Sequence, residues 1–240
     1  MKTMFFENFK KGKKMQDQSL ERSQSGVESI LVVPELLPRK RTLVLEAGTT
    51  PFDSDLTQEF FYIILSGKVK ISQINLSNAR EQTIKLLSRG DMFDVLTLLD
   101  NQEHDYIATV LEAGEALEVP MEDVRTLMHN SDSFNSFMLS YIANEMRSLE
   151  ELTLDLSLHD VYERLVHLLA RNTVNEGGKS HLELIDNLSH EELATLVGSV
   201  RKVVNRNLQR LKDEGLIEIS RKKIELKNPQ TLLEKLDSAT

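Results

Sequence analysis

The sequence contains no cysteine among its 240 residues. This absence excludes disulfide bonds, cysteine-ligated iron–sulfur clusters, thiolate zinc sites and cysteine nucleophiles. No apolar run approaches the roughly 20 residues that span a bilayer, and residues 1–14 lack the apolar centre of a signal peptide. We therefore expect a soluble, cytoplasmic protein without a membrane partner.

Motifs of the common enzyme classes are missing as well. The sequence has no Gly-x-Gly-x-x-Gly fingerprint, no Gly-x-x-x-x-Gly-Lys-Ser/Thr phosphate loop and no Gly-x-Ser-x-Gly elbow. A cupin-like metal-dependent enzyme is the main alternative from another class, but it needs clustered histidines on neighbouring strands. Of the six histidines, only His104 falls in the strand-rich part of the chain. We therefore predict no enzyme, no catalytic residue and no metal site.

Positive charge is scarce overall but concentrated near the C-terminus. The whole chain carries 29 Lys and Arg against 38 Asp and Glu, a net charge of -9. Residues 24–198 hold 13 basic and 29 acidic side chains, whereas residues 199–227 hold nine basic and four acidic ones. Because charges more than about 10 Å apart are largely screened at 0.1 M salt, the local balance decides binding. A basic segment in an otherwise acidic chain is compatible with nucleic-acid binding.

Hydrophobic patterning divides the chain into parts of different character and predicts an α+β fold. Short apolar runs between glycines predict a small sandwich or barrel, with Ser66-Gly67 as a tight hairpin signal. Helical periodicity begins after Pro120. The predicted parts are a flexible arm (1–26), a sensor β-barrel (27–130), a long helix (131–158), a winged helix-turn-helix (159–230) and a C-terminal tail (231–240).

The long helix carries a narrow apolar stripe over residues 134–156. Its members recur at steps of three and four residues, and charged side chains border them. A narrow stripe on a helix of this length is typical of packing on a partner helix, so we predict a homodimer. The alternative is packing on the chain's own barrel only. The predicted dimerisation residues are Met138, Ile142, Met146, Leu149, Leu152 and Leu156.

The C-terminal part has the order of elements of a winged helix-turn-helix. Ser189-x-x-Glu192 forms a capping box that opens a helix, and Gly198 ends it. A second helix is predicted over residues 200–214, and an alternating basic hairpin over residues 216–226. A helix, a short glycine-containing turn, a second helix and a hairpin together indicate a DNA-binding module.

The second helix separates apolar from polar residues. Val203, Val204, Leu208 and Leu211 fall on a core-facing set, and basic and amide side chains fall on the other side. Arg can bind guanine with two hydrogen bonds, and Asn can pair with adenine. The alternative is a solvated face that happens to be basic. The predicted DNA-binding residues are Ser189, Ser199, Arg201, Lys202, Asn205 and Arg206, with Arg221 and Lys222 in the hairpin turn.

The chain resembles the CRP/FNR superfamily of bacterial transcription regulators across roughly residues 28–228. The resemblance is carried by Phe-Tyr-Ile-Ile-Leu-Ser-Gly-Lys-Val at 61–69, Gly-Asp-Met-Phe at 90–93 and the segment 188–206. It implies a double-stranded β-helix or jelly-roll barrel of cyclic-nucleotide-binding type, a dimerisation helix and a winged helix-turn-helix. The implied partners are a second copy, a near-palindromic site on double-stranded DNA, and RNA polymerase.

The same resemblance bears on which residues read DNA. The family motif has an arginine, an acidic residue and a second arginine four positions after the acid. Arg201 and Arg206 match the arginines, whereas Lys202 stands at the acidic position. A sensor module that signals through proteins without binding DNA is a further alternative, and it leaves this basic helix unexplained.

The residues expected to bind a ligand depart from the cyclic-AMP-binding members of the family. Their Gly-Glu pair for the ribose is Asp94-Val95 here, and their Arg-Ser pair for the phosphate is Tyr106-Ile107. A buried phosphate needs a cation and hydroxyl donors, so we predict that cyclic AMP does not bind. The iron–sulfur cluster of the oxygen-sensing branch is excluded because cysteine is absent. Haem stays open, with His104 as candidate ligand, and so does a barrel without any ligand.

Overall fold

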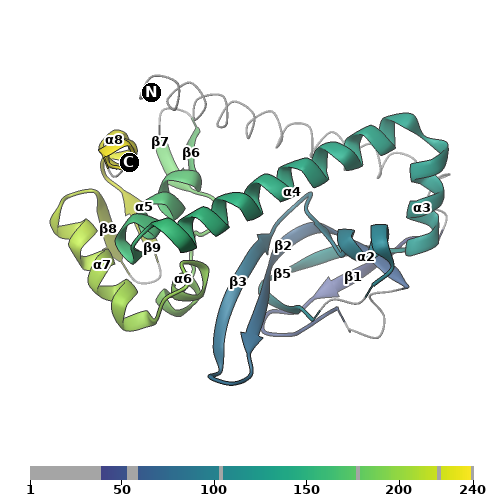
Figure 1. Cartoon of the computed structure of the whole chain (residues 1–240), viewed down its shortest axis with the longest axis horizontal. Coiled ribbons are helices and arrows are strands. Elements are labelled where there is room, and N and C mark those ends of the chain that lie inside the picture. Colours follow the sequence, from purple (N-terminus) through teal and green to yellow (C-terminus); the bar gives the residue numbers. More distant parts are fainter. Residues whose placement is uncertain (1–38, 53–58, 103–104, 177–178, 221–222, 239–240) are drawn as a thin grey trace. The chain divides into compact units, whose positions relative to one another are not determined.

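The computed structural model describes residues 39–52, 59–102, 105–176, 179–220 and 223–238. These residues form two compact units, one within Met1–Lys70 and Leu87–Ser148, and the other within Ile71–Leu86 and Leu149–Thr240. We refer to them as the sensor unit and the C-terminal unit, and Figure 1 labels their elements. No described helix is long and apolar enough to cross a membrane.

The strands before α3 form an antiparallel sheet whose order is β1-β5-β2-β3, with β4 pairing β2. The end of β2 and nearly all of β3 belong to the C-terminal unit, and the other strands belong to the sensor unit. Opposite one another on β1 and β5 lie Arg41 and Glu118 at one end, and Leu45 and Gly114 at the other. The mixture of sheet and helices confirms the predicted α+β class, although no closed barrel is detected among the described strands. The strands are β1 (Arg41–Leu45), β2 (Phe60–Asn75), β3 (Arg80–Leu87), β4 (Met92–Phe93) and β5 (Ile107–Pro120).

The predicted hairpin at Ser66-Gly67 is wrong, because β2 continues through it. Gly67 has a φ of +87°, and a Cβ there would lie 2.6 Å from the Glu112 carbonyl oxygen. A Cβ on Gly114 of β5 would lie 2.1 Å from the Ser66 carbonyl oxygen. The glycines therefore permit two backbones to approach closely rather than to turn.

The core of the sensor unit lies between its sheet and three helices. The helices are α2 (Val95–Asp100), α3 (Met121–Asn130) and the first part of α4 (Asp132–Leu158). Tyr141 on α4 accepts a hydrogen bond at its hydroxyl from the Met92 backbone N–H at 3.0 Å. The buried residues from these elements include Phe61, Ile63, Leu98, Leu117, Val119, Val124, Leu127 and Met138.

The C-terminal unit contains the remaining helices and two small hairpins. Most of helix α8 (Pro229–Ser238) falls in the segment 231–240 predicted as a tail, and its Leu232 is fully buried. Helix α5 contacts both α7 and α8, and α6 contacts α7. The elements are α5 (Val161–Arg171), β6 (Thr173–Glu176), β7 (Lys179–Leu182), α6 (His190–Leu196), α7 (Arg201–Asp213), β8 (Ile217–Ser220), β9 (Lys223–Leu226) and α8 (Pro229–Ser238).

Candidate nucleic-acid interface

Helix α6 begins with the capping box that the sequence predicts. The Ser189 side chain accepts a hydrogen bond from the Glu192 backbone N–H at 3.2 Å, and the Glu192 carboxylate accepts one from the Ser189 N–H. These two bonds satisfy donors that the first turn leaves free. Ser189 therefore caps the start of α6, and its contact with DNA stays a prediction.

The turn between α6 and α7 depends on Gly198. Its φ is +61°, and a Cβ there would lie 2.7 Å from Leu156 Cδ2 and 2.9 Å from Gln82 Oε1. The Ser199 N–H donates to the Ala194 carbonyl at 2.8 Å, which closes the turn. A side chain at position 198 would be strained by both backbone conformation and crowding.

The hairpin of residues 71–86 contacts this turn within the C-terminal unit. The Thr83 and Thr195 hydroxyls lie 2.7 Å apart, and both residues are buried. Arg80 Nη2 donates to the Gly198 carbonyl oxygen, and Gln82 Nε2 donates to that of Leu196 at 3.5 Å. The turn that sets the start of α7 is therefore held by side chains from β3.

Helix α7 buries one face, largely as the sequence predicts. Val204, Leu208 and Leu211 are fully buried, which confirms their assignment to the core-facing set. Val203 is only half-buried, and Asn207 is buried although its polarity predicts an outward position. Asn207 lies three residues after Val204, so the two share the buried face of α7.

The outward residues of α7 include most of the predicted DNA-binding set. Arg201, Lys202, Asn205 and Arg206 are exposed, and Ser199 is half-buried. Among the described residues, no ion pair engages Arg201, Lys202 or Arg206. The Asn205 Oδ1 atom is hydrogen-bonded to His190 Nδ1 at the start of α6. Val200, which sequence reasoning did not select, is 56% exposed immediately before Arg201.

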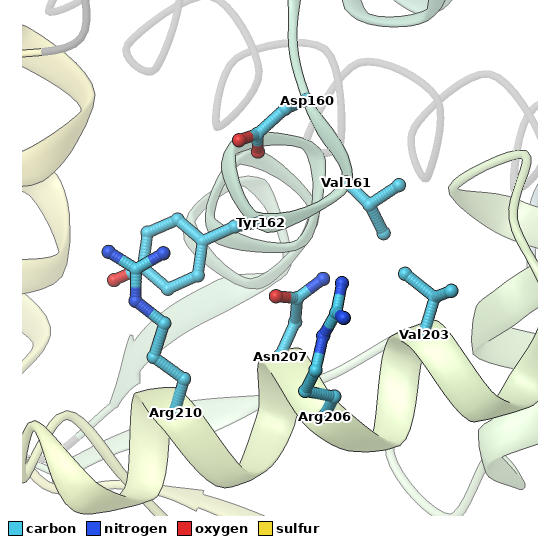
Figure 2. A pocket seen from close by; sticks show the side chains of 7 residues that line it. All are labelled: Asp160, Val161, Tyr162, Val203, Arg206, Asn207 and Arg210. Carbon is cyan, nitrogen blue, oxygen red and sulfur yellow. The ribbon is translucent and has the colours of Figure 1, made fainter.

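Arg201 and Arg206 are both exposed, on the part of α7 that faces away from its buried residues. Five residues along an α-helix correspond to a rotation of about 140°, so the two side chains leave this exposed part at different angles. Arg201 is the first residue of α7, whereas Arg206 lines a groove of about 440 Å³ between α5 and α7. Figure 2 shows Arg206 and Asn207 extending from α7 toward α5, beside Tyr162. Arg201 is therefore at the tip of the helix and Arg206 at its flank.

A charged network holds the far end of α7. The Tyr162 hydroxyl donates to Glu214 Oε2 at 2.6 Å, Lys235 Nζ lies 2.7 Å from the same atom, and Arg210 Nε donates to Oε1 at 2.9 Å. The Arg210 guanidinium also lies over the Tyr162 ring, as Figure 2 shows. Burial alone would raise the pKa of Glu214, but Lys235, Tyr162 and Arg210 outweigh it and lower the pKa to about 2.

The β8–β9 hairpin follows α7 where a wing is predicted. Its two strands are antiparallel, with Ile217 opposite Leu226 and Ser220 opposite Lys223. The predicted contact residues Arg221 and Lys222 lie outside the described residues. Lys223 forms an ion pair with Glu225 at 3.0 Å, and Lys227 with Glu218 at 2.5 Å.

The apolar stripe of α4 differs from the predicted one at its first member. Met138 is fully buried in the core of the sensor unit, so its assignment to an exposed seam is wrong. Leu139 is 58% exposed instead, and its position continues a three-four spacing with the later members. Ile142 and Leu152 are half-buried, and the exposed members are Met146, Leu149 and Leu156.

The positions expected to hold a ligand lie at the ends of α2 and β5. Asp94 has a φ of 71° before α2, and its carboxylate accepts a hydrogen bond from Thr97. Tyr106 and Ile107 are each 38% exposed. The buried Lys68 ammonium is bound to Glu112 at 2.9 Å. The haem candidate His104 lies outside the described residues.

Family models match both parts of the chain. A model described as a cyclic nucleotide-binding domain matches residues 42–131, and one described as a Crp-like helix-turn-helix domain matches residues 163–235. Together they cover the sheet of the sensor unit and the α5–α8 region. The two matches thus agree with the order of elements along the chain.

Known proteins similar to this chain are transcription regulators rather than enzymes. A global nitrogen regulator of Nostoc sp. is 30% identical over 191 residues, which are 78% of this chain and 85% of that protein. A CRP-like cAMP-activated global transcriptional regulator of Mycobacterium tuberculosis is 28% identical over 189 residues, which are 77% of this chain and 83% of that protein. A CooA mutant structure from Carboxydothermus hydrogenoformans has a TM-score of 0.70 at 19% identity, covering 84% of this chain and 90% of that one, and supports the fold. The chain belongs to the CRP/FNR superfamily of transcription regulators.

Proposed function

We propose that this regulator reads duplex DNA with the N-terminal part of α7. The observation that carries the proposal is the exposed set Arg201, Lys202 and Arg206, without carboxylate partners in the described chain, on a helix whose other face is buried. The helix starts at a turn fixed by Gly198. A rigid helix tip with long donors suits the major groove, where each base pair has a distinct hydrogen-bond pattern.

The working form is a homodimer on a near-palindromic site. Regulators of the CRP family bind DNA and act as dimers. The exposed residues Leu139, Met146, Leu149 and Leu156 of α4 supply an apolar surface for a second copy. A two-fold dimer presents two recognition helices, so its operator has two related half-sites. RNA polymerase is the further partner expected of a cytoplasmic regulator that acts at promoters.

The sensor unit responds to something other than cyclic AMP. Asp94-Val95 and Tyr106-Ile107 supply no cation at the positions where ribose and phosphate partners are expected. Tyr106 and Ile107 are partly exposed, and Lys68 is already bound to Glu112. In calorimetric titration we expect no cyclic AMP binding in the low micromolar range, which corresponds to about -8 kcal/mol. Binding at that strength would contradict this part of the proposal.

The reading role of α7 is tested by selecting binding sites from a random duplex pool. Arg201→Ala should then weaken binding to the selected site far more than binding to random duplex at the same salt. A bidentate base contact contributes about 1–3 kcal/mol of discrimination. Lys222→Ala should weaken both about equally, because phosphate contacts carry no sequence information.

Lys212→Ala provides a matched control on α7 itself. Lys212 is exposed near the end of the helix, far along it from Arg201. Lys212→Ala also removes one positive charge, but away from the start of the helix. Any loss of phosphate attraction should weaken specific and random binding alike, so the ratio of the two affinities should stay unchanged. If Arg201→Ala reduces the affinity for specific and random DNA equally, Arg201 contacts phosphates and not bases.

A further inference from the structure

Two pairs of residues face each other where α4 meets α5 in the C-terminal unit. Asp155 and His159 lie four residues apart at the end of α4, and the His159 N–H donates to the Asp155 carbonyl at 3.2 Å. His167 and Arg171 lie four residues apart on α5. Because residues four apart share a helix face, the corner brings these side chains together.

The contacts across the corner are short and largely shielded from solvent. Asp155 Oδ1 lies 2.6 Å from His167 Nδ1, and Oδ2 lies 2.7 Å from Arg171 Nη2. The rings of His159 and His167 meet edge to face, with centroids 4.5 Å apart. The side chains of Asp155, His159 and His167 are 10%, 20% and 12% exposed. His167 therefore contacts the buried Asp155 carboxylate directly, and His159 lies against the His167 ring.

The geometry points to a binding site for a divalent first-row transition metal ion of the Zn²⁺ class, with Asp155, His159 and His167 as ligands. One ligand atom from each residue lies within 4.8 Å of the other two. Two imidazoles and a carboxylate are a common ligand set for such ions, with an open position for water. Bonds of about 2.0–2.2 Å place ligand atoms about 3–3.5 Å apart, so rotation of the side chains by a small amount closes the site.

The charges around the corner favour a cation. Arg171 contacts Asp155 Oδ2, so Oδ1 is the oxygen on the side of His167. Glu151 lies 3.5 Å from Arg171 Nε, and Glu163 lies 3.6 Å from His159 Nδ1, so two more carboxylates balance the added charge. Burial alone would raise the pKa of Asp155, but His167 and Arg171 outweigh it and keep that pKa below its ordinary value.

A hydrogen-bonded corner without an ion is the competing explanation. It accounts for Asp155, His167 and Arg171, whose contacts form a continuous chain. It gives His159 no role beyond its ring contact and its approach to Glu163. An ion would use all three ligands and would fix the end of α4 against α5, the first helix of the DNA-binding part. The site goes beyond the proposed function and does not depend on DNA.

Titration of the untagged, chelator-treated full chain with Co²⁺ tests the site. We expect visible d–d absorption that saturates at one ion per chain and disappears when Zn²⁺ is added. Zn²⁺ should also raise the midpoint of thermal unfolding, because it binds the native state. His159→Gln should weaken Zn²⁺ binding by at least about tenfold, and it leaves the contacts among Asp155, His167 and Arg171 in place.

His181→Gln is the matched control, since His181 is an exposed histidine on β7. It should bind Zn²⁺ as the unaltered chain does. Absence of the Co²⁺ bands, or equal weakening by the two variants, would overturn the proposal. A measurement without variants is the Zn²⁺-induced shift of histidine ring resonances, which should affect His159 and His167, and shifts confined to other histidines would also overturn it. All these readouts are taken without DNA, so their failure leaves the proposed function standing.

Discussion

Helix α7 and the β8–β9 hairpin are both rich in Lys and Arg, yet they present their charge differently. Arg201, Lys202 and Arg206 on α7 have no acidic partner among the described residues. In the hairpin, Lys223 and Lys227 are paired with Glu225 and Glu218. A count of charge along the sequence treats both segments alike. The ion pairs show the difference: the described cations of the hairpin are paired, as is Arg210 near the end of α7, whereas Arg201, Lys202 and Arg206 are available for an outside partner.

The largest effect should come from separating the two copies of α7. Replacing Ile142 and Leu149 together with Asp places charge in the exposed stripe of α4 and should give monomers in sedimentation. A monomer binds one half-site, so affinity for the full site should fall by at least about 100-fold. Ser140→Asp with Ser148→Asp, on other sides of α4, is the control. A dimer that survives the Ile142 and Leu149 changes would contradict the predicted seam.

The second prediction compares the effect on DNA binding of one substitution in α7 with that of one in the β8–β9 hairpin. Arg206→Ala should cost about 1–3 kcal/mol of specific binding if Arg206 contacts a base. Lys223→Ala should cost less, because the Glu225 carboxylate 3.0 Å away offsets the charge of Lys223 and a phosphate contact carries no sequence information. Gel-shift titration at one salt concentration compares the two variants. A larger loss for Lys223→Ala would reverse the assignment of the two regions.

The two glycines that flank α7 allow a matched test of how its position is set. Gly198 and Gly215 both have positive φ, 61° and 74°, but a Cβ on Gly215 meets nothing within 4 Å. Gly215→Ala should therefore cost only backbone strain, about 1 kcal/mol. Gly198→Ala should cost more, because Leu156 and Gln82 must also move. Urea unfolding measures both, and equal losses would argue against crowding at the turn.

The smallest effect is on stability and concerns the charged network around Glu214 at the far end of α7. The folded-state pKa of Glu214 is about 2, below its ordinary 4.5. A lowered folded pKa contributes stability above about pH 4.5, and that stability is lost as the pH falls toward 2. Glu214→Gln should thus lower the free energy of unfolding by about 1 kcal/mol near neutral pH, and the difference should shrink in acid.

Glu183→Gln is the control for that measurement, since Glu183 is exposed on the segment after β7. Its difference from the unaltered chain should stay small at every pH. A Glu214→Gln difference that does not shrink below about pH 4.5 would mean that the network acts through packing and not through charge.

Local signals in the sequence predicted the C-terminal unit well. The capping box of Ser189 and Glu192 is present, and α7 begins and ends within one residue of the predicted bounds. Caps, glycine turns and apolar spacing act over a few residues, so a sequence displays them directly. The corner of Asp155, His159 and His167 was missed because the break after α4, which sets the angle between two helices, decides that contact.

Contacts between distant segments explain the predictions that failed. Met138 has the same helical spacing as the exposed stripe, but the sheet of the sensor unit covers it. Periodicity identifies an apolar residue and cannot tell which neighbour buries it. Gly67 reads as a turn residue, whereas the approach of β5 is what requires it. Both errors concern residues whose partners lie far along the chain.

The ratio of affinities for a selected site and for random duplex, at one salt concentration, tests the central claim most directly. Specific regulators typically bind their sites at least about 1,000-fold more tightly than random DNA. If Arg201, Lys202 and Arg206 reach base edges, the unaltered chain should reach this ratio, and Arg201→Ala should reduce it. A ratio near one for the unaltered chain would contradict sequence-specific reading by α7.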